Sequence, residues 1–232
     1  MSWLRGHWQL LLLTALVFVL WQTPVATPVK ILIVFMHEVS HGLAALATGG
    51  RIEAITVSLQ QGGLTTTRGG SLFAILSAGY LGSLVLGVAI LLVALRTHLD
   101  RALMALLGAA MVAISAFYIR DWFAFGFGMG SGGLMLAAAR FLPRDVNDLI
   151  LRLIGLTSLI YVPYDIFDDT IRRASESSDA YMLADRFGGA TMMWGGLWLV
   201  ISALVIVASL RWGLGVASNI SLGRESWPQR RG

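Results

Sequence analysis

The chain has 232 residues, of which 56% are hydrophobic and 13% are charged. Soluble domains carry about 25% charged residues, so this composition excludes an ordinary soluble protein and predicts a polytopic membrane protein. The net charge of +4 comes from Arg and Lys scattered between apolar runs, without the basic and aromatic pattern of a nucleic-acid-binding module. We therefore expect contact with the lipid bilayer and none with nucleic acid. The absence of Cys excludes disulfide scaffolds, thiolate metal sites and Cys nucleophiles.

Seven apolar stretches approach the roughly 20 residues that cross a bilayer as a helix. Because the fourth and sixth are short, the predicted fold class is an all-α polytopic membrane protein with six or seven transmembrane helices. The first stretch resembles a signal peptide, but the spans that follow it favour a retained helix. The stretches run from Trp8 to Ala26, Val29 to Thr48, Leu72 to Leu95, Ala102 to Ile119, Trp122 to Ala139, Leu149 to Tyr164 and Thr191 to Leu210.

The spans predict one integral-membrane domain at residues 1–211, followed by a polar, flexible tail at 212–232. Arg residues in this tail slightly favour a cytoplasmic C-terminus. We expect an integral protein of the bacterial cytoplasmic membrane, and the sequence assigns no oligomeric state.

Between the second and third stretches the hydrophobic period changes. Within residues 51–70, apolar side chains stand in near alternation at Ile52, Ile55, Val57 and Leu59, and Gln60-Gln61-Gly62-Gly63 then leads to Leu64-Thr65-Thr66-Thr67. This pattern predicts a β-hairpin, with a plain connecting loop as the alternative. A hairpin here would offer an exposed strand edge to an extended substrate.

The second stretch contains His37-Glu38-Val39-Ser40-His41, an H-E-x-x-H sequence inside a segment that otherwise reads as membrane-embedded helix. Two His four positions apart share one helical face and can bind one Zn²⁺, while the Glu between them can act as a base. Ionisable groups in a membrane segment are costly, which favours a functional role over a chance match.

A catalytic zinc site usually takes three protein ligands. The other two histidines, His7 and His98, lie outside the spans, so we expect the third ligand to be an Asp near the sixth stretch. Asp165 lies seven residues before Arg172, about 10 Å along a helix, which matches the depth of His41. We therefore name Asp165, and keep two alternatives open. Asp179 can instead cap the helix that follows it, and Asp168 can pair with an Arg one turn later.

Together these motifs resemble the site-2 protease superfamily of intramembrane zinc metallopeptidases, and more closely its compact M50B-like branch. The resemblance covers residues 33 to 200. Its elements are His37-Glu38-x-x-His41, Gly49-Gly50, the hairpin, Ala78-Gly79-Tyr80-Leu81-Gly82, Asp165-x-x-Asp168-Asp169, Ser178-Asp179-Ala180 and the segment from Trp194 to Trp198.

The resemblance implies an intramembrane zinc metalloprotease that hydrolyses peptide bonds of membrane protein substrates. His37, His41 and one Asp would bind Zn²⁺, and Glu38 would be the general base toward a metal-activated water. The superfamily usually places its Asp ligand in an Asp-Gly pair, which this chain lacks, so the resemblance does not choose among the three candidates.

Two other functions fit the same residues. A catalytically inactive relative would act by binding membrane partners, and it would be indifferent to Glu38→Gln. A metal transporter would use the His and Asp side chains along a pathway, but further polar residues are scarce in the spans.

Overall fold

The computed structural model describes residues 2–172 and 178–220. Within them the protein is mostly helical, with one antiparallel hairpin after the second helix. Seven helices are long and apolar enough to cross a membrane, which confirms the predicted fold class. The helices are α1 (Ser2–Leu20), α2 (Thr27–Ala47), α3 (Leu72–Arg96), α4 (Asp100–Tyr118), α5 (Trp122–Phe141), α6 (Arg144–Phe167), α7 (Asp179–Phe187) and α8 (Thr191–Gly213), with a 3₁₀ turn η1 (Pro24–Ala26) and a π-helical turn η2 (Asp168–Arg172).

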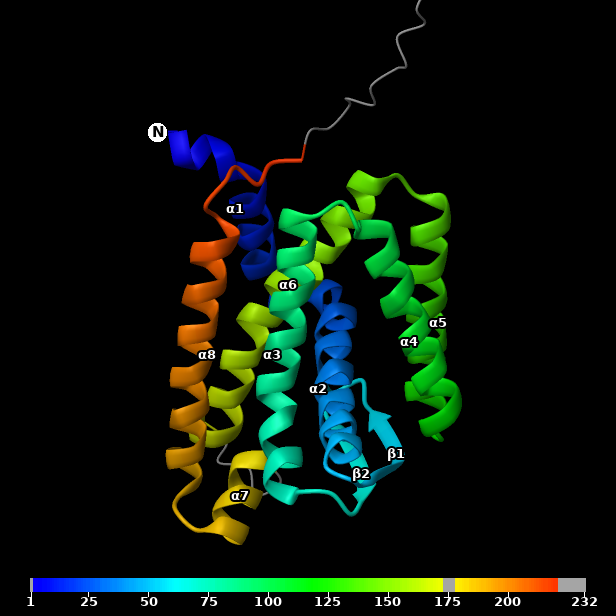
Figure 1. Cartoon of the computed structure of the whole chain (residues 1–232), viewed down its shortest axis with the longest axis vertical. Helices are drawn as coiled ribbons and strands as arrows, with labels where there is room; N and C mark the ends of the chain where they lie inside the picture. The colour runs from blue at the N-terminus through cyan, green and yellow to red at the C-terminus, as the bar shows by residue number, and fades with distance from the viewer. Residues whose placement is uncertain (1, 173–177, 221–232) are drawn as a thin grey trace, which may run out of the picture.

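Helix α2 lies at the centre of the bundle. Figure 1 shows α3, α6 and α8 on one side of it and the α4–α5 pair on the other. Of its apolar segment 67% is buried, compared with 22% for α4 and for α5. A helix that is apolar around most of its circumference is most stable in such a central position. The metal motif is therefore carried by the best-enclosed helix of the protein.

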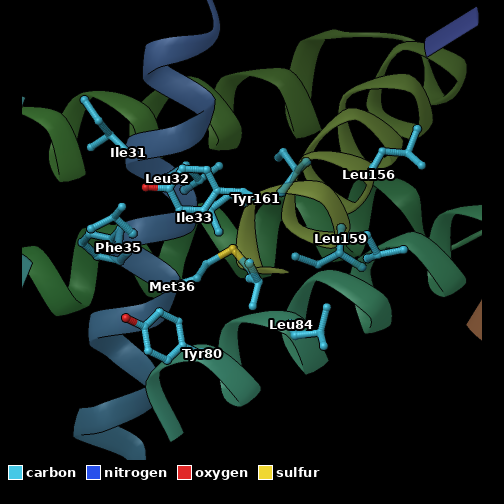
Figure 2. Packing of buried hydrophobic residues seen from close by; sticks show 14 of the residues in the cluster. Ile31, Leu32, Ile33, Phe35, Met36, Tyr80, Leu84, Leu156, Leu159 and Tyr161 are labelled. Carbon is cyan, nitrogen blue, oxygen red and sulfur yellow. The ribbon is translucent and has the colours of Figure 1, made fainter. Parts of the chain in front are cut away.

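The core forms where α2 meets α3 and α6. Figure 2 shows side chains of α2 packed against residues of both neighbouring helices, and all of them are buried. Small residues let the helices approach closely: a Cβ at Gly82 of α3 would lie 2.6 Å from the Cβ of Ser40 in α2. The residues labelled in Figure 2 are Ile31, Leu32, Ile33, Phe35 and Met36 of α2, Tyr80 and Leu84 of α3, and Leu156, Leu159 and Tyr161 of α6.

The hairpin consists of β1 (Arg51–Val57) and β2 (Gly63–Arg68), which confirms the β-hairpin predicted at residues 51–70. Ile55 pairs with Thr65, and the register shifts between Ile52 and Ala54. The hairpin packs on α2 through its inward face, where Ile55 is fully buried. On its other edge β1 makes a single parallel bridge to Ile119, after α4. Among the described residues β2 pairs with β1 alone.

The first turns of α1 and the segment after α8 lie together at the upper end of the bundle in Figure 1. There the buried side chains of His7, Asp148, Arg152 and Ser218, which we call the terminal clasp, join α1 and α6 to the segment after α8. His7 Nδ1 lies 2.8 Å from Ser218 Oγ, and the backbone N–H of Ser218 donates to Gly6. The tail expected to be flexible from residue 212 thus begins as an anchored segment that reaches Ile220. Residues 221–232 lie outside the described residues.

Candidate metal centre

The first part of the centre is built by the helical period of α2. This helix is regular through residues 37–41, so His37 and His41 lie one turn apart on the same face. Their Nε2 atoms are 3.0 Å apart and the rings meet edge to face. Both nitrogens therefore face one point beside the helix, as the sequence spacing predicts for a shared metal.

Helix α3 supplies the space for the two rings. A Cβ at Gly79 would lie 2.5 Å from His37 Nε2 and 2.5 Å from His41 Cε1, so any other residue at position 79 would displace them. The next residue, Tyr80, packs its ring against His37 and donates a hydrogen bond to Asp169 Oδ2 at 2.6 Å. The Ala78-Gly79-Tyr80 motif thus acts at the metal centre, and not only in helix packing.

The third candidate ligand comes from α7. Asp179 Oδ2 lies 3.2 Å from His37 Nε2 and 3.3 Å from His41 Nε2. We call His37, His41 and Asp179 the metal group. No other three His, Asp or Glu side chains converge in this way within residues 2–172 and 178–220.

This arrangement differs from the sequence-based choice of Asp165, which is not a member of the metal group. Asp165 lies near the end of α6, whereas the chain continues through η2 and returns with α7, which packs against α3 and α8. Asp168, the other alternative, pairs with Arg172 at 3.4 Å, as its i,i+4 spacing suggested. Of the three candidates, the structure brings Asp179 alone to the histidines.

The local structure of α7 explains why Asp179 is available. The sequence suggested that Asp179 itself caps this helix, but the N-cap is Ser178, whose hydroxyl accepts a hydrogen bond from the backbone N–H of Tyr181. Asp179 occupies the first helical position, and its carboxylate is free to point toward α2. Ala180 and Leu183 are fully buried and fix this face of α7 against the bundle.

The three ligand atoms have the geometry of a metal site. Ligands at about 2.0–2.1 Å from a tetrahedral Zn²⁺ lie about 3.3 Å from one another. The observed separations of 3.0, 3.2 and 3.3 Å are close to that value. Asp179 Oδ2 is also a buried oxygen that faces the two ring nitrogens, and a cation bound between them would satisfy it. The residues present therefore fit a zinc ion.

The tautomer of His41 supports the same conclusion. Its Nδ1 lies 2.7 Å from the backbone oxygen of Ile75, which can only accept a hydrogen bond. The proton of a neutral His41 is thus on Nδ1, and the lone pair of Nε2 points at the metal position. Metal-binding histidines are commonly oriented in this way by a second hydrogen bond.

The electrostatics of Asp179 match the role of a ligand. Burial raises the pKa of its carboxyl group, but His41 and His37 in their protonated form, before a metal displaces those protons, outweigh this effect and hold the pKa below its usual range. The carboxyl is therefore ionised at neutral pH, which is the state that binds a metal.

Glu38 lies next to the metal group and under the hairpin. It is 5% exposed, and its Oε2 accepts a hydrogen bond from Thr65 Oγ1 at 2.7 Å. Sequence reasoning missed this contact with β2, because the polarity of residues 63–67 favours Leu64 on the inward face, whereas Leu64 is exposed and Thr65 contacts Glu38. His7 and His98 lie elsewhere, His7 against Ser218 and His98 against Arg144.

Comparison with known proteins places this centre in a family. A family model described as Peptidase M50B-like matches residues 10–209, which include α2, the hairpin and α7. No curated protein and no solved structure matches the chain. The match covers most of the chain, and it agrees with the resemblance seen in the H-E-x-x-H helix and the later motifs. The chain belongs to the Peptidase M50B-like family.

Proposed function

We propose that the protein is an intramembrane zinc metalloprotease that hydrolyses peptide bonds of membrane-embedded substrates. The observation that carries this proposal is the convergence of His37, His41 and Asp179 beside the buried carboxylate of Glu38. Two His and one carboxylate are a common ligand set of catalytic zinc, and they leave a fourth position for water or substrate. Membership of a peptidase family supports the same reaction class.

Each residue of the centre has a defined role in this reaction. His37, His41 and Asp179 would hold the metal, which would supply Lewis acidity toward water and the scissile carbonyl. Glu38 accepts a proton from the attacking water and then donates it to the leaving amine. Gly79 keeps the two rings in place, and the Ile75 carbonyl fixes the tautomer of His41.

The hairpin provides a place for the substrate. A peptide in a transmembrane helix keeps its carbonyl groups in hydrogen bonds, so cleavage requires an extended segment. The outer edge of β2 can pair with such a segment by strand addition. Because Thr65 of β2 contacts Glu38, a peptide on this edge would lie beside the base.

The seven candidate spans support an integral membrane protein. We propose the bacterial cytoplasmic membrane as its location. A membrane protein segment is then the substrate, because the centre is carried by a helix that is itself a candidate span.

The test is zinc-dependent cleavage by the purified protein in proteoliposomes. The probe is a single-span peptide with Gly and Pro in its membrane segment, labelled at both ends. We expect the zinc-loaded protein to cleave it, and Glu38→Gln to lower the rate about a thousandfold while zinc content and fold are retained. Full zinc occupancy without cleavage of a panel of such peptides would contradict the proposal, as would undiminished cleavage by the Glu38→Gln variant.

A further inference from the structure

The contact between Thr65 and Glu38 is more specific than packing. Thr65 Oγ1 lies 2.7 Å from Glu38 Oε2 and 2.9 Å from the backbone oxygen of the same residue. A threonine hydroxyl has one proton, so the Oε2 atom and the backbone oxygen of Glu38 share it. The hydroxyl therefore fixes the carboxylate relative to its own helix, and so restricts the rotation of the side chain.

A second residue of β2 shapes the same place. A Cβ at Gly63 would lie 2.6 Å from Glu38 Cγ, so a larger residue there would push the side chain away. Gly63 and Thr65 are two positions apart in β2 and therefore face the same side of the hairpin. That side of the hairpin packs closely over the Glu38 side chain.

The position of Thr65 is set by the strand that carries it. Thr65 pairs with Ile55, which is fully buried against α2 and bridges to Ile119 on its other side. The hydroxyl is thus held by a short sheet, while Glu38 is held by the most buried helix. The Thr65 hydroxyl thus links the hairpin to the carboxylate carried by α2.

We infer that Thr65 is a positioning residue for the general base, through which the substrate-receiving strand is coupled to Glu38. This inference rests on the proposed function. A substrate that pairs with the outer edge of β2 orders the strand whose inward face holds the carboxylate. Substrate binding then also positions the Glu38 carboxylate.

The test compares two substitutions of Thr65. Thr65→Val removes the hydroxyl and keeps the branched shape that suits a strand, whereas Thr65→Ser keeps the hydroxyl. We expect Thr65→Val to lower kcat about tenfold to a hundredfold, with KM and zinc affinity unchanged, because a hydrogen bond to a charged group is lost. Thr65→Ser should restore most of the rate. If Thr65→Val does not fold, Thr65→Ala serves as the second variant without a hydroxyl.

The matched control is Thr56→Val in β1. Thr56 Oγ1 donates to the backbone oxygen of Leu64 at 3.4 Å, so this change removes a hydrogen bond of the hairpin that does not touch Glu38. We expect its kcat to match that of the wild type. An equal loss of kcat in both valine variants would overturn the inference, because hairpin stability would then explain the effect. An unchanged kcat in Thr65→Val would also overturn it.

A spectroscopic readout separates this inference from the proposed function. Infrared difference spectra of the wild type against Glu38→Gln identify the carboxylate bands of Glu38. We expect those bands to shift in Thr65→Val and to return in Thr65→Ser, whether or not any peptide is cleaved. Unshifted bands in Thr65→Val would refute the role of Thr65, even for a protein that hydrolyses its substrate. A wild type without hydrolysis but with the expected band shifts would refute the proposed function alone.

Discussion

At one end of the bundle the terminal clasp holds the buried His7 and Asp148, and at the other end the metal group holds the buried His41 and Asp179 beside the half-buried His37 (Figure 1). In the clasp every charge meets an opposite charge or a hydrogen-bonding group: Arg152 donates to both oxygens of Asp148, at 2.6 and 2.8 Å, and also to the backbone oxygen of Ser218. In the metal group a carboxylate oxygen and two ring nitrogens face one another, and no Arg or Lys lies among them.

The difference teaches how a buried His or Asp should be interpreted. Buried polar groups are normally satisfied by partners within the protein, and the clasp follows this rule. Three ligand atoms that face one point, with no Arg or Lys among them, indicate a cation site instead. Burial alone does not identify a metal site, whereas the convergence of three ligand atoms on one point indicates one.

Replacing one histidine in each region by alanine should give the largest difference in zinc affinity. We expect His41→Ala to lower zinc affinity about a thousandfold, more than the 10–100-fold that loss of an outer-shell partner costs. His7→Ala should leave zinc affinity unchanged, because His7 contacts Ser218 at the opposite end. Titration of the purified variants with a zinc buffer measures both. An equal loss of zinc in the two variants would contradict the distinction between the regions.

The clasp should matter for stability and not for metal binding. Arg152→Met leaves the Asp148 carboxylate buried without its partner, which costs about 3–5 kcal/mol of unfolding free energy. Denaturation of the protein in mixed micelles measures this loss. The folded fraction should still bind zinc with wild-type affinity, and a drop in that affinity would mean that the two ends are coupled.

Removal of zinc should lower the free energy of unfolding by less than Arg152→Met does. Zinc that binds the folded state alone, at a free concentration a hundred times its Kd, stabilises by about 2.7 kcal/mol. Chelation should then lower the Tm by about 5–10 °C. Chelation should lower the Tm of the His7→Ala variant by the same amount, and it should leave the Tm of the His41→Ala variant unchanged. A chelator-induced shift that persists in His41→Ala would place the metal elsewhere.

Local sequence patterns predict much of the fold and two of the three members of the metal group. Apolar segments of the right length predict the spans, alternation predicts the hairpin, and the four-residue spacing of His37 and His41 predicts one shared face of a helix. These features depend on neighbours in the chain. The shared face of His37 and His41 is present in the structure because α2 is a regular helix through both residues.

The third ligand depends on the path of the chain, which local patterns do not contain. Ranking by depth favoured Asp165 because it assumes that the sixth helix runs straight out of the membrane. The chain instead returns with α7, which is anchored by Ala180 and Leu183. One local signal pointed to Asp179: a serine at 178 is itself a good N-cap, and it leaves the following carboxylate available for another role.

The most direct test of the metal group is the zinc affinity of two aspartate variants. Asp179→Ala and Asp165→Ala remove a carboxylate from α7 and from α6, respectively, and each is titrated with zinc in the purified, folded state. We expect Asp179→Ala to lose zinc affinity about a thousandfold, as His41→Ala does, and Asp165→Ala to bind zinc like the wild type. Zinc binding that survives Asp179→Ala but is lost in Asp165→Ala would contradict the assignment of Asp179 as the third ligand.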